Sequence, residues 1–251
     1  MKVLAVINQK GGAGKTTTAL NVGACLATDY RVLIVDTDPQ GNLTTSAGIN
    51  TLENDRTLYE VLKGQVQISD AIIKRTNYDI LPTDIRQSGA ELELSNIPGR
   101  DFLLKEALEQ IKEEYDFIII DCPPSLSVIT LMGLTACDKV IIPVQAQYLA
   151  LQGMAQLLKT IELVKMRMNP RIEIGAVVLT MYDSRKNLDN EIKRNISEAF
   201  PNKLLETTVS HNVSLAEAPA YGKDILDYAP KSKGAQQYIA LTKELMNKIN
   251  H

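Results

Sequence analysis

Residues 10–17 read Lys-Gly-Gly-Ala-Gly-Lys-Thr-Thr, and this stretch decides the fold. It follows a short apolar run at residues 3–7 and opens a segment of helical period at residues 15–28. A strand, a glycine loop and a helix start in this order form the context that a phosphate-binding loop requires. The glycines let backbone N–H groups converge on a phosphate, and the helix start adds positive potential. A plain glycine turn would not need Lys and then Thr at the helix start, so we interpret the stretch as a phosphate-binding loop.

Two side chains of this loop suit a triphosphate bound with Mg²⁺. Lys15 offers a point charge to the β- and γ-phosphates, and Thr16 offers a hydroxyl to the metal ion. The common pattern has glycine at position 9, where this chain has Gln9, and the loop carries a second lysine, Lys10. Two lysines carry more positive charge than is needed to bind one triphosphate. Lys10 is therefore a candidate for neutralising phosphate charge on something opposite, such as a second copy of the chain.

Two other apolar runs end in acidic residues. Residues 32–35 precede Asp36-Thr37-Asp38-Pro39-Gln40-Gly41-Asn42, and residues 117–120 precede Asp121. Carboxylates at the C-terminal ends of parallel strands lie beside the phosphate loop in such sheets, where they hold Mg²⁺ or orient an attacking water. The first segment also has turn chemistry, and an acid after a buried strand is common. Because a phosphate-binding loop precedes them in the chain, we interpret both acidic segments as parts of a nucleotide site.

The rest of the chain alternates apolar runs with segments of helical period. Strands are expected at residues 3–7, 32–35, 78–81, 117–120, 140–144 and 174–179, with a seventh candidate at 204–209. Helices are expected at residues 15–28, 102–113, 127–136, 149–168, 188–200 and 234–250, with short helices within 49–77. This alternation predicts an α/β fold, a single doubly wound, mostly parallel sheet flanked by helices, in one domain over residues 1–251.

Composition narrows the class of protein. The 251 residues carry 27 Lys+Arg and 30 Asp+Glu, a net charge of −3, with 45% apolar and 23% charged residues. This globular composition excludes a disordered chain and a protein that coats DNA through bulk charge. No run approaches the roughly 18 apolar residues of a membrane span, and the start lacks a signal-peptide pattern. We therefore expect a cytoplasmic protein without integral membrane association. Its three scattered cysteines predict reduced thiols.

Four segments together resemble the ParA/Soj partition ATPases of the deviant Walker A, MinD-like superfamily. They are KGGAGKTT, DTDPQGN, FIIIDCPPS and LAEAPAYGKDILDYAPKSKGAQQY, and the resemblance spans essentially the whole chain. It implies a P-loop NTPase that binds ATP and Mg²⁺ and forms a homodimer around two nucleotides. It implies further that the dimer binds double-stranded DNA of the nucleoid without sequence preference. A ParB-like centromere-binding partner then stimulates a slow ATP hydrolysis and releases the dimer, so that chromosome or plasmid DNA is segregated.

The resemblance also assigns site residues position by position. Lys10 looks like the signature lysine that reaches the second subunit's phosphates, Lys15 like the phosphate lysine, and Asp38 like the residue that positions the attacking water. Those three form the implied catalytic set. Metal contacts are implied for Thr16, Asp38 and Asp121. The implied nucleotide contacts are Lys10, Gly11, Gly12, Ala13, Gly14, Lys15, Thr16 and Thr17, with Met181 and Asn212 at the base.

The chain departs from the family in one stretch. Where members usually have Pro-Arg-Asn-Val-Arg, this chain has Ser210-His211-Asn212-Val213-Ser214, so both arginines associated with DNA contact are absent. Another arginine that the family uses for DNA is matched by Arg185. The expected DNA-binding set is Arg185, Lys186, Lys193, Arg194 and Lys223. The candidates to compensate for the missing arginines are Lys186, Lys193, Arg194, Lys203, Lys223, Lys231 and Lys233. Lysines on solvated helix faces are the competing interpretation.

Three other functions share parts of these motifs. A MinD-like membrane-associated positioning ATPase would end in a basic amphipathic helix, but the apolar positions of residues 234–250 suit packing against the sheet. A metallocluster carrier needs paired cysteines, which Cys25, Cys122 and Cys137 do not provide. A ParA-like ATPase that positions a protein cargo would have identical ATPase residues, and this alternative stays open.

Overall fold

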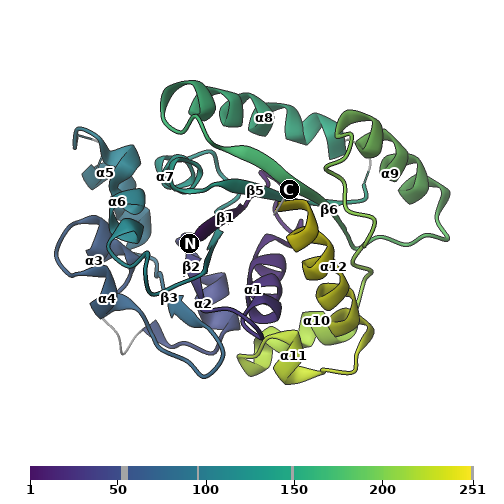
Figure 1. The fold of residues 1–251 in the computed structure, drawn as a ribbon, viewed down its shortest axis with the longest axis horizontal. Helices are drawn as coiled ribbons and strands as arrows, with labels where there is room; N and C mark the ends of the chain where they lie inside the picture. The colour runs from purple at the N-terminus through teal and green to yellow at the C-terminus, as the bar shows by residue number, and fades with distance from the viewer. Residues whose placement is uncertain (52–55, 95, 148–149, 250–251) are drawn as a thin grey trace.

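The computed structural model describes residues 1–51, 56–94, 96–147 and 150–249. Within them, six strands form one sheet in the order β3-β2-β4-β1-β5-β6, and every pair of neighbours is parallel (Figure 1). The strands are β1 (Lys2–Val6), β2 (Val32–Asp36), β3 (Asp79–Leu81), β4 (Phe117–Asp121), β5 (Lys139–Gln145) and β6 (Glu173–Thr180). This confirms the expected parallel sheet, because each strand is a run of apolar residues covered on both faces.

Helices connect the strands and lie on both faces of the sheet (Figure 1). In the first half of the chain they are α1 (Lys15–Leu26), α2 (Asn42–Ser46), α3 (Leu58–Leu62), α4 (Ile68–Ala71), α5 (Gln87–Leu94) and α6 (Leu103–Glu109). In the second half they are α7 (Val128–Ala136), α8 (Ala150–Arg167), α9 (Asn187–Ala199), α10 (Val213–Glu217), α11 (Ile225–Tyr228) and α12 (Lys233–Ile249). The 3₁₀ turns η2 (Arg100–Phe102) and η3 (Ala218–Tyr221) lie between these helices.

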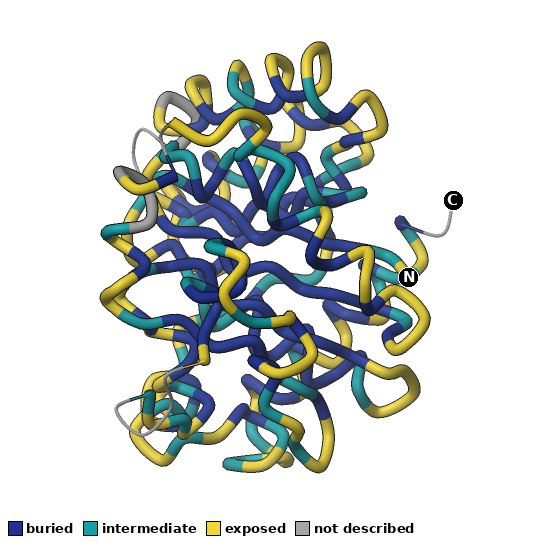
Figure 2. The backbone as a smooth tube through the Cα atoms, turned by 90° about the vertical axis from the view of Figure 1, so that its left-hand side faces the viewer, coloured by how far each residue is buried: buried dark blue, intermediate teal, exposed yellow. Residues whose placement is uncertain are grey.

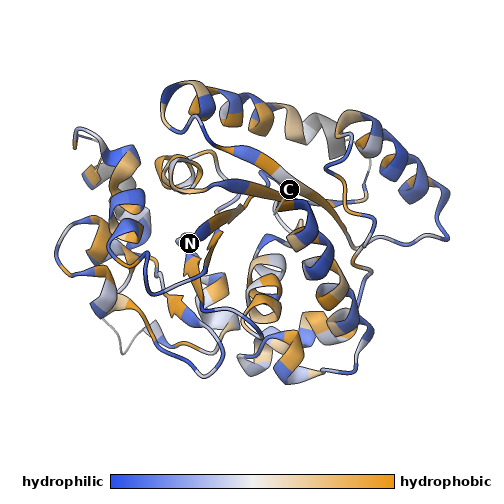
Figure 3. Ribbon diagram, viewed as in Figure 1, coloured by the Kyte–Doolittle hydropathy of each residue, from blue (hydrophilic) through white to orange (hydrophobic). Residues whose placement is uncertain are grey.

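The core has two layers, one on each side of the sheet. Successive side chains of β1 alternate between them: Val3 and Ala5 pack with α6, α7 and α8, whereas Leu4 and Val6 pack with α1 and α12. Figure 2 shows that the backbone at the centre of the molecule is buried, and Figure 3 shows the apolar character of the strands against the polar outer faces of the helices. The doubly wound prediction is therefore confirmed.

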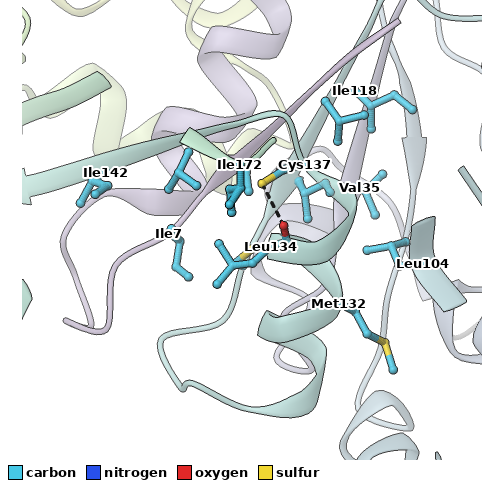
Figure 4. Close-up of a cluster of buried hydrophobic side chains, with 14 of the residues drawn as sticks. Ile7, Val35, Leu104, Ile118, Met132, Leu134, Cys137, Ile142 and Ile172 are labelled. Atoms are coloured by element: carbon cyan, nitrogen blue, oxygen red, sulfur yellow. Dashed lines mark hydrogen bonds between the residues drawn. The ribbon is translucent and has the colours of Figure 1, made fainter. Parts of the chain in front are cut away.

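The cysteines are part of this core. Figure 4 shows Cys137 among the side chains of the first layer, where its thiol donates a weak hydrogen bond to the carbonyl oxygen of Leu134 at 3.5 Å. Cys25 and Cys122 are also free and buried, and burial raises the pKa of the Cys25 thiol to about 11. The expectation of reduced thiols is confirmed.

Residues 204–209 form no strand, so the prediction of a seventh strand is wrong. Leu204 makes a single β-bridge to β6. Beyond it, the Glu244 carboxylate on α12 accepts the backbone N–H groups of Glu206 at 2.7 Å and Thr207 at 2.9 Å. These donors are thereby diverted from the sheet, and the segment crosses the edge of β6 without a continuous ladder.

The other differences lie at helix ends. The helix expected over residues 102–113 ends at Glu109, where turns follow, and its first residue belongs to η2. Short helices within residues 49–77 are confirmed as α3 and α4, whereas α2, α5, α10 and α11 were not expected. The expected helix ends at residues 149 and 250 lie outside the described residues. Among the described helices, none combines the length and the apolar character needed to traverse a bilayer.

Candidate functional site

The phosphate-binding loop joins the C-terminal end of β1 to the start of α1. Gly12 and Gly14 have φ values of 72° and 83°, in the left-handed region that glycine adopts at little cost. A Cβ added to Gly11 or Gly12 would meet no described atom within 4 Å. The loop therefore presents open backbone at the N-terminal end of a twelve-residue helix, which is the geometry that anions bind.

Two buried side chains that the sequence analysis missed tie this loop to the sheet. The Asn8 amide donates to the carbonyl of Pro143 at 2.7 Å, while its oxygen accepts the N–H of Lys10 at 3.0 Å. The Thr180 hydroxyl donates to the carbonyl of Ala13 at 2.9 Å. Both residues are polar positions directly after an apolar run, which is the one sequence signal that marks them.

Lys15 and Thr16 lie at the first turn of α1, facing the end of β4. The Lys15 side chain is only 7% exposed and its ammonium donates to the carbonyl of Lys10 at 3.3 Å. Burial lowers the pKa of Lys15, and the negative charges of Asp121 and Asp38 oppose that shift. The Thr16 hydroxyl donates to Asp121 Oδ2 at 2.7 Å. The structure thus brings four of the candidate residues, Lys15, Thr16, Asp38 and Asp121, into direct contact or charge interaction.

Asp121 has an oxygen that the described protein leaves unused. The residue is fully buried, and its Oδ1 has no hydrogen-bond partner among the described residues. Burial, followed by the charge of neighbouring Asp36, raises the pKa of Asp121 well above its usual range. A free carboxylate oxygen beside a threonine hydroxyl is the oxygen donor set that Mg²⁺ prefers. The residues present therefore fit this ion.

The described residues include no cluster of three or more His, Cys, Asp or Glu side chains arranged to hold a metal by themselves. A cation at Thr16 and Asp121 would thus need additional ligands from phosphate oxygens and water. Mg²⁺ commonly binds in this way, through one or two protein oxygens plus substrate phosphates.

Asp36 and Asp38 at the end of β2 have different surroundings. Asp36 pairs with Asp121 across the β2–β4 register, and its carboxylate accepts both the N–H of Thr44 at 2.8 Å and its hydroxyl at 2.7 Å. It is therefore committed to the local fold. Asp38 is 8% exposed, and its Oδ1 accepts the N–H of Gln40 at 3.0 Å, which fixes it in a turn at the same edge of the sheet.

The ammonium groups of Lys10 and Lys15 have different hydrogen-bond partners. The Lys10 ammonium donates to the side-chain oxygen of Gln147, in the segment after β5, while the Lys10 carbonyl faces the Lys15 ammonium. Lys15 thus contacts the backbone of the loop, whereas Lys10 contacts a residue outside the loop.

The two candidate base residues meet in a pocket of about 240 Å³ beside the loop. Met181 lines it with φ of 52°, an unusual backbone conformation for a residue other than glycine. Asn212 lines it from the start of α10, where its oxygen caps the helix by accepting the N–H of Leu215 at 3.2 Å. Gly14 and Thr17 form the side of the pocket next to the phosphate loop. A base and its phosphates can therefore be held side by side.

The candidate DNA-binding residues do not form one patch. Arg185 and Lys186 precede α9, a largely hydrophilic helix (Figure 3) that carries Lys193 and Arg194, whereas Lys223 lies apart, between η3 and α11 (Figure 1). Arg185 pairs with Asp183 through two hydrogen bonds of 2.9 and 2.8 Å, and Lys193 with Glu206 at 3.4 Å. Exposed pairs of this kind contribute about 0–1 kcal/mol, so a polyanion can displace them.

Comparisons with known proteins agree with this architecture. A family model described as an AAA domain matches residues 1–174. The chain is 47% identical over 248 residues to the sporulation initiation inhibitor protein Soj of Bacillus subtilis, covering 97% of this chain and 98% of Soj. It is 43% identical over 253 residues to the chromosome partitioning protein ParA of Caulobacter vibrioides, covering 99% of this chain and 95% of ParA.

A solved structure matches over the full length. It is that of cobyrinic acid a,c-diamide synthase from Mycobacterium smegmatis with a bound ATP analogue and magnesium, at a TM-score of 0.88 and 36% identity, covering 100% of this chain and 96% of the other. Identity of more than two fifths to Soj and to ParA, over nearly the whole of each chain, accompanies the phosphate loop and acidic strand ends described above. This chain therefore belongs to the ParA/Soj family of chromosome-partitioning ATPases.

Proposed function

We propose that residues 1–251 act as one ATPase domain that binds ATP with Mg²⁺ and hydrolyses it to ADP and phosphate. The observation that supports this most is the convergence of Lys15, Thr16, Asp38 and Asp121 at one edge of the sheet, around an open glycine loop. The bound ATP analogue and magnesium in the Mycobacterium smegmatis structure agree with it. The base lies between Met181 and Asn212, and the phosphates lie over residues 10–17.

Each residue has a distinct role in this proposal. The Lys15 ammonium neutralises phosphate charge, and the Thr16 hydroxyl and Asp121 carboxylate hold the ion, which supplies charge neutralisation on the β- and γ-phosphates. Asp38 accepts a hydrogen bond from the attacking water and orients it toward the γ-phosphate. Neither the loop nor the lining of the base pocket includes an arginine, so hydrolysis is slow until a partner contributes to it.

ATP binding is coupled to dimer formation in the proposed cycle. The Lys10 ammonium contacts Gln147, outside its own loop, and in the dimer it exchanges this partner for the phosphates held by a second copy of the chain. The ATP-bound dimer binds double-stranded DNA without sequence preference, through the basic residues at α9 and Lys223. A ParB-like centromere-binding partner stimulates hydrolysis and ends the DNA-bound state. The protein thereby works at the nucleoid in the cytoplasm, on chromosome or plasmid DNA.

The same ATPase residues would serve a protein that positions another cargo or that works at a membrane surface. The partition function is favoured because the two relatives of highest identity described above include a chromosome partitioning protein. These alternatives are distinguished by what the ATP-bound dimer binds.

Dimerisation tests the first step of the cycle. The mass in solution is measured by light scattering for Asp38→Ala and for double variants that combine it with Lys10→Ala or with the matched control Lys112→Ala. The Lys112 ammonium pairs with Glu109 on α6. With ATP and Mg²⁺ we expect Asp38→Ala and its Lys112→Ala double variant to be dimers, and the Asp38→Ala, Lys10→Ala double variant to stay monomeric while it still binds ATP. An ATP-bound Asp38→Ala monomer, or dimers without Lys10, would contradict the proposal.

A further inference from the structure

Thr180 contacts the phosphate loop at Ala13 and Gly14. The threonine ends β6, is 3% exposed, and donates its hydroxyl to the carbonyl of Ala13, which is itself fully buried. Its methyl group lies 3.4 Å from where a Cβ of Gly14 would stand. Gly14 caps α1 with φ of 83° and no side-chain hydrogen bond. The turn from loop to helix is therefore supported by Thr180, from a strand far along the chain.

The backbone around Thr180 is held in a strained turn. Met181 follows it with φ of 52°, a conformation that costs free energy for a side chain of this size. The turn is fixed on both sides, because the N–H of Tyr182 donates to the carbonyl of Val209 at 3.1 Å and the N–H of Val209 donates to the carbonyl of Leu179 at 2.9 Å. A strained backbone conformation of this kind is retained where the side chains that it positions have a role.

The turn positions side chains for two parts of the site. Thr180 and Met181 are consecutive, and both line the base pocket together with Gly14 and Thr17. Tyr238 completes the pocket from α12, with its hydroxyl 3.2 Å from the hydroxyl of Thr18. The C-terminal end of β6 thus contacts both the base pocket and the phosphate loop.

We propose that Thr180 is a positioning residue of the nucleotide site: its hydroxyl holds the Ala13 carbonyl so that the loop N–H groups converge on the phosphates. The inference rests on the proposed ATP-binding function. Without the hydroxyl, the Ala13 carbonyl is buried and unpaired, and the loop must shift to find another donor. The affinity for phosphate groups then falls, both for a nucleotide and for a polyphosphate without a base.

Three substitutions separate the hydroxyl from the methyl group. Thr180→Val keeps the shape and removes the donor, Thr180→Ala removes both, and Thr180→Ser keeps the donor. Thr28→Val is the control, because Thr28 donates to the carbonyl of Cys25 at 2.9 Å near the far end of α1. Affinities for ATP and for inorganic tripolyphosphate, each with Mg²⁺, are measured by calorimetry. Thermal unfolding without ligand reports whether each variant folds.

We expect Thr180→Val and Thr180→Ala to bind both ligands about tenfold more weakly, and Thr180→Ser and Thr28→Val to bind within about twofold of the wild type. Weakened ATP binding with unchanged tripolyphosphate binding would overturn the proposal, since Thr180 would then serve the base pocket alone. An equal loss in Thr180→Ser would overturn it too, by assigning the effect to the methyl group.

A second measurement needs no ligand. Hydrogen–deuterium exchange of residues 8–17 in the nucleotide-free protein should be faster in Thr180→Val and unchanged in Thr180→Ser. Unchanged exchange in Thr180→Val would contradict a positioning role for the hydroxyl. A wild type that binds neither ATP nor tripolyphosphate would instead overturn the proposed function, and that result is distinct from a Thr180 variant that matches the wild type.

Discussion

Asp121 carries a free-energy cost to the fold and is also a proposed ligand of Mg²⁺. Its carboxylate is fully buried with one oxygen unpartnered among the described residues, and burial raises its pKa. A hydrogen bond from Thr16 and the charge of Lys15 offset part of that cost. A buried polar atom without a partner is uncommon in folded proteins and marks a place where a ligand completes the bonding. In this account that ligand is Mg²⁺ with the phosphates.

Lys15 should be the most sensitive position in the loop. Lys15→Ala removes a buried ammonium beside the phosphate loop, and we expect nucleotide affinity to fall at least about a hundredfold, as the loss of a charge-assisted contact in a desolvated site predicts. Calorimetric titration with ATP and Mg²⁺ measures this. The control Lys63→Ala removes an ammonium that pairs with Glu93 away from the site and should bind normally. ATP binding by Lys15→Ala at wild-type affinity would refute the assignment.

At the scale of elements, the features predicted best from the sequence are those that appear as a local pattern of residues. Strands covered on both faces are continuous apolar runs, so six of them were found close to their observed positions. The loop and its acids follow from spacing along the chain. Glu244, which diverts the backbone of residues 206–207 from the sheet, and Thr180, which supports the loop, act across the fold. No local pattern encodes such contacts, and this is why the seventh strand was predicted wrongly and Thr180 was missed.

One such contact joins α2 to η3 through two glycines. Gly48 and Gly222 both have positive φ, of 74° and 63°, and a Cβ on Gly222 would lie 2.5 Å from the Cα of Gly48. The contact links the segment after Asp38 to the one after Asn212. It therefore joins a segment near the proposed phosphate site to a segment near the proposed base pocket.

Gly222→Ala should show how tight that contact is. We expect it to lower the free energy of unfolding by about 2–4 kcal/mol, combining the left-handed conformation with a clash against backbone. Gly64→Ala is the matched control, because Gly64 has φ of 68° but a Cβ there would meet no described atom within 4 Å. It should cost only about 1–2 kcal/mol. Urea unfolding gives both values, and equal losses would mean that the close approach carries no energetic weight.

At the scale of the whole molecule, the proposed ATP site and the candidate DNA-binding cations involve different residues. The acidic strand ends and the glycine loop gather at one edge, where ATP would bind. The candidate DNA-binding cations lie at α9 and, separately, beside α11 (Figure 1). One copy of the chain, with a net charge of −3, thus offers four candidate cations at α9 and one, Lys223, beside α11. Doubling these groups in a dimer is what would make binding to the DNA backbone strong enough to measure.

The most direct test is therefore duplex-DNA binding by Asp38→Ala, which should hold ATP without hydrolysing it. Binding to duplexes of unrelated sequence is measured without nucleotide, with ADP, and with ATP and Mg²⁺, at low and at physiological salt. We predict sequence-independent binding only with ATP and Mg²⁺, weakening at least about tenfold between the two salt concentrations, as release of counterions from several phosphate contacts requires. An ATP-bound dimer that binds no DNA at either salt would contradict the partition function, and equal binding in all three nucleotide states would contradict the ATP switch.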